Sequence, residues 1–451
     1  MNHNAEKDKY KNQGLTGTAG YQLSENFKIE NSLRYARANL NYDEPNAATN
    51  DENNRTDNVE GTYSLKLMHN KNKFKNTLSL NKSYIERNVT SATNTYTNYF
   101  GFRDAVNFTG EYNFNLDNKL VYGAEAEFDA ARYPSDYAPQ KWAWAKRLSD
   151  KAADEHIFSQ FFDYQFRPFE NVYSTVGLRS DEHSTTGRKA SGRTTLAYKL
   201  DGNSKIRSSL GSGIRFPALY DYHYANGNTP ASGAGPDAPF HMENLKVERA
   251  LSYDFGYDTN LDFLDLDLSI TYFNIAQKNP LASDSRNNWK MRNQSGESTS
   301  EGIEFSGDWK PKDKKIRLGF GYTFTDTYDS NTCDAGDCGL SGGGSELSTS
   351  KVRVPRHALS TQISHNTTQN LNNTLSIKFV DEVRDFGNTN NSFADVVLDD
   401  YTIFNFSSTY KIFNSYNLFF NATNIFDDKY EQALQYSSMG RSFNFGIKRA
   451  F

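Results

Sequence analysis

Apolar and polar residues alternate along most of the chain with a period of two, the spacing of residues on one face of a β-strand. Within residues 250–257, Leu251, Tyr253, Phe255 and Tyr257 fall on one face, and small or polar residues fall on the other. A helical period is nearly absent. The pattern therefore predicts an all-β protein whose strands have one apolar and one polar face.

The alternating segments are numerous and long. About nineteen can be counted, and most exceed the ~9–11 residues that a tilted strand needs to cross a bilayer. Strands of a soluble sandwich also alternate, so number and length are the features that favour a membrane barrel. The segments lie near residues 14–25, 26–43, 56–72, 73–90, 94–116, 118–134, 156–168, 171–184, 188–201, 204–222, 248–261, 262–281, 287–309, 314–330, 351–368, 370–387, 394–413, 416–433 and 440–451.

The connections between these segments alternate in length. Short turns such as residues 23–26, 70–73 and 201–203 alternate with long polar loops such as 135–155 and 223–247. Short turns on one side and long loops on the other are typical of outer-membrane barrels. We therefore predict a transmembrane antiparallel β-barrel. Because single-chain bacterial barrels close with an even number of strands, the odd count indicates that part of the barrel is absent.

The composition fits strands with only one face in lipid. Hydrophobic residues make up 36% of the chain, yet it holds 28 Tyr and 32 Phe, too many aromatic residues for a disordered protein. The sequence has no apolar run of about 18 residues, which excludes membrane helices, and its N-terminus shows no secretory signal. The 50 basic and 55 acidic residues form no basic stripe, so nucleic acid is not expected as a partner.

The two cysteines, Cys333 and Cys338, lie close together in a loop rich in Gly and Asp. Two thiols cannot form a structural zinc site of the usual four-ligand kind. We expect them to form a small disulfide in an oxidising compartment, and two free exposed thiols are the alternative.

Loop 135–155 gathers aromatic and basic side chains. It holds Tyr137, Trp142 and Trp144 among four basic residues, and so contains half of the tryptophans. These rings would suit a planar ligand such as a corrin, a porphyrin or an aromatic siderophore. An interfacial girdle of Trp beside lysines that bind lipopolysaccharide explains the same residues equally well.

Three stretches resemble the barrel of the TonB-dependent outer-membrane receptors. Residues 211–220 are similar to a strand end of that family, and residues 243–253 are similar to the box that follows it. Residues 421–431, with Gly440 and Arg441, are similar to its closing hairpin. The resemblance implies a barrel of the ~22-stranded, plugged type, of which about 19 strands are present.

The last segment ends on an aromatic residue. Phe443, Phe445, Ile447 and Phe451 alternate with polar residues, in a pattern that resembles the signal read by the bacterial outer-membrane insertion machinery. The same residues also fit an ordinary aromatic girdle. We expect the barrel assembly machinery as a partner, and Arg449 as a residue that snorkels to the headgroups.

Within the family, residues 291–304, 352–357 and 430–436 are most similar to the cobalamin (vitamin B12) receptors. Aligned in that way, residues 1–451 form a partial barrel domain that begins near the end of the third strand. The signal peptide, the TonB box, the plug and about three N-terminal strands would then be missing. The expected ligand is cobalamin, with heme or a ferric siderophore as the alternatives.

The resemblance to cobalamin receptors also implies calcium in the early extracellular loops. Calcium takes about six to eight oxygen ligands, chiefly carboxylates and carbonyls. Glu6, Asp8, Tyr42 and Asp43 fall where such ligands are expected. A solvated acidic loop is the simpler explanation of the same residues.

Heme receptors of the same family place a ligand histidine between the two boxes described above. His223 and His241 lie in the corresponding loop, and a neutral imidazole there would serve as an axial iron ligand. Histidines that are merely part of a polar loop surface are the simpler explanation.

The sequence contains no nucleophile–base arrangement and no phosphate loop, so an enzyme is not expected. We expect a monomeric receptor in the outer membrane of a Gram-negative bacterium, in contact with lipid and lipopolysaccharide. The TonB–ExbB–ExbD complex would energise uptake through the missing plug, and no cofactor is required. A passive porin is the alternative from another class. Alternation places five charged residues in the lumen, namely Asp254, Asp265, Asp267, Arg292 and Glu304.

Overall fold

The computed structural model describes most of the chain. The described residues are 9–42, 54–90, 96–132, 152–225, 245–284, 290–293, 296–312, 315–329, 351–389, 392–413 and 415–449. Within them, none of the helices has the length and apolar character needed to cross a membrane.

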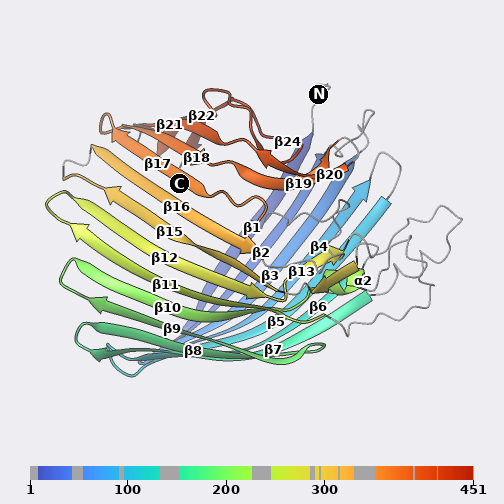
Figure 1. The fold of residues 1–451 in the computed structure, drawn as a ribbon. Helices are drawn as coiled ribbons and strands as arrows, with labels where there is room; N and C mark the ends of the chain where they lie inside the picture. Colours follow the sequence, from blue (N-terminus) through green and yellow to red (C-terminus); the bar gives the residue numbers. More distant parts are fainter. Residues whose placement is uncertain are drawn as a thin grey trace, which may run out of the picture.

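The described residues form a sheet of nineteen antiparallel strands, which confirms the predicted fold class and strand number (Figure 1). Each strand pairs with the next one in the sheet. The strands are β1 (Tyr10–Ser24), β2 (Phe27–Asn41), β3 (Arg55–Lys71), β4 (Phe74–Thr90), β5 (Tyr96–Asn113), β6 (Lys119–Arg132), β7 (Ala152–Phe169), β8 (Val172–His183), β9 (Gly187–Lys199), β10 (Ser204–Arg215), β11 (Glu248–Leu261), β12 (Leu266–Lys278), β15 (Glu297–Trp309), β16 (Ile316–Asp329), β17 (His357–Asn366), β18 (Leu371–Val380), β21 (Tyr401–Phe413), β22 (Tyr416–Thr423) and β25 (Ser442–Arg449).

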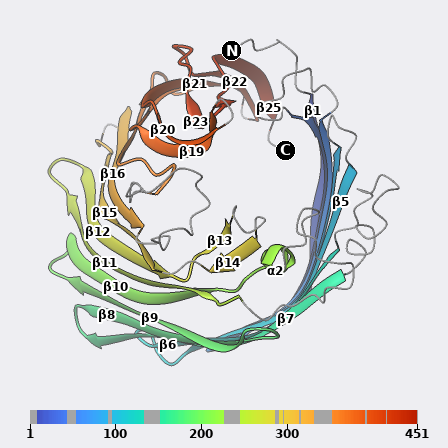
Figure 2. The same ribbon diagram turned by 45° about the vertical axis from the view of Figure 1, so that its right-hand side comes forward.

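Smaller elements lie inside the curve of this sheet (Figure 2). They are the helix α2 (Leu219–Ala225) and the strands β13 (Leu281–Asp284), β14 (Lys290–Asn293), β19 (Val383–Thr389), β20 (Ser392–Leu398), β23 (Glu431–Ala433) and β24 (Tyr436–Ser437). The short strands pair as three hairpins, β13–β14, β19–β20 and β23–β24. All of them belong to the longer connections between the sheet strands.

The helix α2 corrects one predicted strand. The alternating segment at 204–222 continues past the end of β10, which stops at Arg215. Proline has no N–H for a strand ladder but suits the start of a helix, and Pro217 stands between the two elements. The chain therefore leaves the sheet here and enters α2 at Leu219.

Connection length divides the two ends of the sheet as predicted. At the short-turn end, β3 and β4 are joined at Asn72, whose φ of 53° is the left-handed conformation that Asn tolerates in tight turns. At the long-loop end, residues 216–247 join β10 to β11. Asp265 also has a positive φ, 54°, and lies in the short turn before β12, so it is outside the strand whose alternation was used to place it in the lumen.

The two faces of the sheet differ in the way that alternation predicts. Phe255 pairs with Tyr272, and Tyr257 with Ile270, on an outer face of exposed apolar residues. On the same outer face of β25 lie Phe443, Phe445 and Ile447, all exposed. Asp254, Asp267 and Glu304 fall on the opposite, inner face. That inner face carries the contacts to α2 and the hairpins.

The two edge strands, β1 and β25, are each paired on one side only within the described residues. All fifteen positions of β1 are exposed. β1 runs from the long-loop end to the short-turn end, and β25 does the same, because the number of antiparallel strands is odd. Figure 2 shows these strands at the two ends of the curved wall.

Gly302 allows β15 and β16 to pair closely. A Cβ at this position would overlap the carbonyl oxygen of Phe324 and the ring of Phe273, whereas a Cβ at Gly319 would meet nothing within 4 Å. We expect Gly302→Ala to cost about 1–3 kcal/mol through overpacking, and Gly319→Ala to leave stability unchanged or slightly higher. The temperature at which the folded band is lost on a semi-native gel measures both. Equal midpoints for the two variants would contradict the argument.

Candidate functional site

The long-loop end of the sheet carries the elements that fold inward, and buried carboxylates hold them in two places. We call these places the Glu248 junction and the Asp385 junction. Glu248 is 5% exposed, and Asp385 is fully buried. A carboxylate removed from water requires cationic or N–H partners, so each junction fixes several segments at once.

The Glu248 junction lies at the base of the connection from β10 to β11. Arg215, the last residue of β10, pairs with Glu248, the first residue of β11, and its Nη2 lies 3.3 Å from Asp221 Oδ2 in α2. The backbone N–H of Leu281 donates to Glu248 Oε1 at 2.7 Å, and that of Ala218 donates to Asp221 Oδ2 at 2.9 Å. The ends of β10 and β11, the helix α2 and the start of β13 are therefore joined through charged hydrogen bonds.

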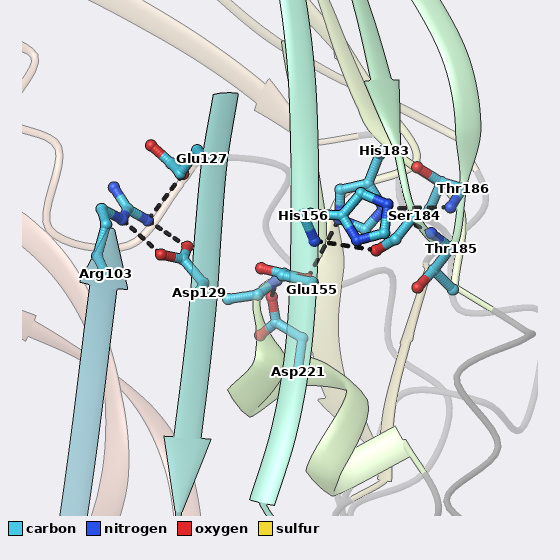
Figure 3. A network of polar contacts seen from close by, with 11 residues as sticks. Arg103, Glu127, Asp129, Glu155, His156, His183, Ser184, Thr185, Thr186 and Asp221 are labelled. Atoms are coloured by element: carbon cyan, nitrogen blue, oxygen red, sulfur yellow. Dashed lines mark hydrogen bonds and ion pairs between the residues drawn. The ribbon is translucent and has the colours of Figure 1, made fainter. Parts of the chain in front are cut away.

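Beside this junction, a fully buried histidine closes the turn from β8 to β9 (Figure 3). His183 Nδ1 accepts from the backbone N–H groups of Thr185 and Thr186 at 3.1 and 3.2 Å. Its proton must therefore sit on Nε2, which donates to Glu155 Oε2 at 3.2 Å. The ring stacks on Phe216, with centroids 4.7 Å apart. His183 thus connects β7, the turn and the segment that enters α2.

The helix α2 is fixed by burial as well as by charge. Tyr222 is fully buried, and Leu219, Leu245 and Val247 are nearly so. Burial raises the pKa of Tyr222 to about 12, so its hydroxyl stays neutral at physiological pH. Residues on both sides of the segment 226–244 thus form a small core at the base of that connection.

The Asp385 junction joins the connection before β17 to two hairpins. Arg353 Nε donates to Asp385 Oδ1 at 2.9 Å, and the backbone N–H of Leu434 donates to Asp385 Oδ2 at 2.6 Å. Arg353 has a φ of 60°, a conformation that ordinary residues rarely adopt. Its own N–H donates to the carbonyl of Arg384 at 2.7 Å, so this conformation is held from both ends.

The closing motif at residues 421–441 has a structural role. Asn424 has a φ of 49°; its side chain donates to the carbonyl of Asp428 at 2.8 Å and accepts from the N–H of the same residue at 2.9 Å. Tyr430 then stacks on Tyr401 of the inner wall, with centroids 4.2 Å apart. Asp427 Oδ1 would lie 2.7 Å from a Cβ at Gly440. These contacts direct the chain away from the end of β22 and pack it against the inner face of the sheet.

A cavity of about 420 Å³ lies next to the Asp385 junction. It is bounded by the long-loop end of β16, the segment before β17 and the β19–β20 hairpin. Its charged lining consists of Lys351, Arg356 and Arg384 against Asp326 and Glu382. The rest of the lining is small, with Thr325, Thr327, Val354, Val396 and Val397. This pocket can hold a small ligand or one part of a larger one, with a modest preference for negative charge.

Most of the predicted site residues lie outside the described residues. These are Glu6, Asp8, Asp43, Tyr137, Trp142, Trp144, His241, Cys333, Cys338 and Phe451. Tyr42 ends β2 at the long-loop end, and its backbone N–H donates to the carbonyl of Asn54 at 3.3 Å. His223 lies in α2. Across the part of the chain that the structure describes, no group of three His, Cys, Asp or Glu could hold a metal ion.

The guanidinium of Arg449 lies over the ring of Tyr416 on the neighbouring strand, 5.2 Å from the centroid. A cation against an aromatic face is stabilised there, near the short-turn end. The expectation that Arg449 reaches the headgroups stays a prediction.

Sequence reasoning missed the residues at the centres of these junctions, His183 and Asp385. Neither lies in a motif. The contacts that join each of them to another segment, Glu155 and Phe216 for His183 and Arg353 and Leu434 for Asp385, are distant in sequence. Glu248 and Arg215 did fall within the boxes, but the boxes alone did not indicate that the two residues pair.

The barrel, the inward hairpins and the anchored long loops together define an outer-membrane receptor of the TonB-dependent type. Residues 2–425 match the family model described as TonB dependent receptor-like, beta-barrel. The chain belongs to this family, whose members are receptors and transporters of the Gram-negative outer membrane. None of the curated proteins compared with the chain matches it in sequence.

Solved structures share the fold. The siderophore receptor PirA from Acinetobacter baumannii is 14% identical, with a TM-score of 0.76 over 99% of this chain and 71% of PirA. The ferric enterobactin receptor PfeA from Pseudomonas aeruginosa is 17% identical, with a TM-score of 0.77 over 99% of this chain and 70% of PfeA. The FrpB iron transporter from Neisseria meningitidis is 12% identical, with a TM-score of 0.76 over 98% of this chain and 72% of FrpB.

Removing the charge of Glu248 should loosen the base of the β10–β11 connection. Glu248→Gln keeps the size of the side chain but removes the nearer of the two anionic partners of Arg215 and leaves only Asp221, which we expect to cost about 2 kcal/mol. Hydrogen exchange at Leu281 and Glu248 should accelerate accordingly. Glu182→Gln, which breaks an exposed pair with Arg188, is the matched control and should change exchange little. Similar exchange in both variants would remove Glu248 from its proposed role.

Proposed function

We propose that this chain is the barrel of a receptor that takes up a ferric siderophore across the outer membrane. The observation that carries the ligand class is the kind of receptor that shares this fold. Proteins with this fold include a siderophore receptor, a ferric enterobactin receptor and a ferric-catecholate import receptor. The TM-scores of 0.73 to 0.77 support a common fold, and the ligand class is proposed by analogy with these receptors.

The pocket beside the Asp385 junction supports the same ligand class. Iron(III) chelated by oxyanions such as catecholates carries a net negative charge. Three cationic side chains against two carboxylates favour such a ligand at the long-loop end, where it would arrive from outside. Hydrogen bonds from guanidinium or ammonium groups to anionic oxygens are also stronger than neutral ones.

Cobalamin, the ligand that the sequence resemblance favoured, becomes the second candidate. Two of the segments behind that resemblance, 352–357 and 430–436, meet at the Asp385 junction through Arg353 and Leu434. Both segments stabilise the fold at this junction. Their resemblance to cobalamin receptors therefore reflects a structural role more than the identity of the ligand. Heme is a third candidate, and a passive porin would lack a specific ligand.

We also propose that further strands and a plug complete the receptor. β1 and β25 run in the same direction, so antiparallel closure between them requires an odd number of added strands. Three strands satisfy that condition, and the relatives are longer than this chain, which spans 71% of PirA. A plug inside the wall would be the element on which the TonB–ExbB–ExbD complex acts. The inner-face carboxylates and arginines would bind it.

A ligand panel tests the proposed function. Cells that express the complete receptor gene should accumulate radiolabelled iron from at least one class of ferric siderophore, and loss of TonB should abolish this uptake. Cyanocobalamin and hemin, with and without calcium, are the comparison ligands. Tight binding of cyanocobalamin together with indifference to every siderophore would overturn the siderophore proposal. Uptake that does not depend on TonB would favour the porin.

Removing two pocket cations should weaken capture of the ligand. The double variant Arg356→Gln, Arg384→Gln is expected to raise the Kd for the ferric siderophore about tenfold, through loss of charge-assisted hydrogen bonds. Arg188→Gln, in an exposed ion pair away from the pocket, is the matched control. Binding to whole cells at several salt concentrations measures the effect. An unchanged Kd would exclude the pocket from ligand capture.

A further inference from the structure

The outer face of β4 and β5 carries an ion pair. Lys82 Nζ lies 3.4 Å from Asp104 Oδ1, and the two side chains are 71% and 56% exposed. The register pairs these residues directly across the two strands. Because residues two apart along a strand share a face, Lys82 lies on the same face as Leu80, and Asp104 lies on the same face as Phe102. Two opposite charges therefore point toward the lipid.

Apolar residues surround this ion pair within the outer face. The register places one aromatic residue beside each charge, Tyr63 of β3 next to Lys82 and Phe128 of β6 next to Asp104. The neighbours along β4 and β5 are Leu80 and Val106 toward the short-turn end, and Tyr84 and Phe102 toward the long-loop end. The pair is therefore enclosed by the apolar band of the wall.

The depth of the ion pair follows from strand geometry. Phe74 begins β4 at the short-turn end, where its ring lies 4.6 Å from that of Tyr112 between centroids. At ~3.3 Å per residue and a tilt of ~40°, Lys82 lies about 20 Å beyond Phe74 along the membrane normal. The apolar band of an outer-membrane barrel is about 25 Å tall. The pair therefore lies in the half of the band nearer the long-loop end, and Tyr84 and Phe102 separate it from the loops.

Other ion pairs of the outer face lie closer to water. Arg37 lies beyond Tyr35 toward the long-loop end of β2, and its Nη2 is 2.7 Å from Asp57 Oδ2. Arg188 and Glu182 pair at 2.7 Å beside the turn from β8 to β9, which is also at the long-loop end. Water and headgroups can solvate charges at that end of the wall, but the apolar band cannot.

Lipid leaves Lys82 and Asp104 short of partners. An ammonium group has three donors and a carboxylate has about four acceptor sites, so a single contact at 3.4 Å leaves most of this capacity unused. Ionisable residues inside the apolar part of a membrane are costly, and they mark functional contacts. A second protein surface with opposite charges at the same depth would supply the missing partners.

The two charges are complementary to themselves. A two-fold axis along the membrane normal, passing between β4 and β5, brings Lys82 of one copy opposite Asp104 of the other, and the reverse. Two copies in one membrane share orientation and depth, so these charges meet at the same level. The neighbouring strand β6 presents the small residues Ala124, Ala126 and Ala130 on its outer face, which allow two walls to approach closely.

We infer that the outer face of β4 and β5 is the surface through which two copies of this chain pair in the membrane. Lys82 and Asp104 of both copies form four alternating charges at the centre of the contact. Tyr63, Phe102 and Phe128 surround these charges and exclude lipid from them. This contact goes beyond the proposed function and does not depend on the ligand. It replaces the monomer that the sequence led us to expect.

Disulfide trapping in intact outer membranes tests the contact. In the complete receptor with Cys333→Ser and Cys338→Ser, Val106→Cys places a thiol beside the proposed axis. Ile303→Cys, on the outer face of β15, is the matched control, since the two native side chains are 42% and 41% exposed. Mild oxidation should give at least about fivefold more disulfide-linked dimer for Val106→Cys than for Ile303→Cys. Equal yields would show a monomer that meets its neighbours at random, and would overturn the inference.

Charge variants distinguish a contact between copies from an ion pair within one chain. Lys82→Asp leaves two acids at the site and Asp104→Lys leaves two bases, so either variant alone should lose at least about fivefold of the Val106→Cys dimer. When the two variants carry different tags and are expressed together, mixed dimers should return to within about twofold of the parent yield. The acids of one copy then face the bases of the other. Mixed dimers no more abundant than the dimers of either variant alone would overturn the inference.

The remaining outcomes also decide. Semi-native gel mobility checks that each variant folds. If the charge variants fail to assemble, Lys82→Gln combined with Asp104→Asn keeps the size of both side chains; a dimer yield about fivefold lower supports the inference, and an unchanged yield overturns it. Capture of a different protein by Val106→Cys, without a second copy, overturns the choice of partner. Uptake of the ferric siderophore is measured separately, so failure of this contact leaves the proposed function intact.

Discussion

Backbone hydrogen bonding is the constraint on which the rest of this structure depends. In lipid, each peptide N–H and C=O must find its partner within the protein, and a sheet of antiparallel strands satisfies this along every internal strand. The nineteen strands meet this demand by pairing each with the next, over the whole strand for β3 and β4 and over part of the strand for β9 and β10. Once the strands are paired, their geometry makes side chains alternate between the lipid face and the lumen face. The residues on the outer face must therefore be apolar wherever they meet lipid, and the residues on the inner face can vary in chemical type.

The chemistry of the inner face is most varied at the long-loop end. The connections there are too long to be fixed by pairing within the main sheet, and buried carboxylates fix them instead. Glu248 and Asp385 each accept hydrogen bonds from two separate segments, so a single charge organises connections that are distant in sequence. His183 does the same with a neutral ring. Segments anchored in this way present the surrounding loops from rigid bases, which suits capture of a ligand.

The strand count, the alternation and the segregation of connection length could be predicted because each is a local property of the sequence. The segment at 204–222 was extended too far because alternation continued through Pro217 into α2, where tertiary packing decided the structure. The sites were harder to predict. Asp385 has no local signal, and its partners Arg353 and Leu434 are 32 and 49 residues away. The aromatic loop and the cysteine pair lie outside the described residues, so those predictions stand as they were made.

The shared direction of β1 and β25 limits how the sheet can be extended. An even number of strands placed between them would leave one neighbouring pair parallel, in a sheet that is otherwise antiparallel throughout the described residues. Strand polarity thus sets a parity rule for any segment that joins the two edges.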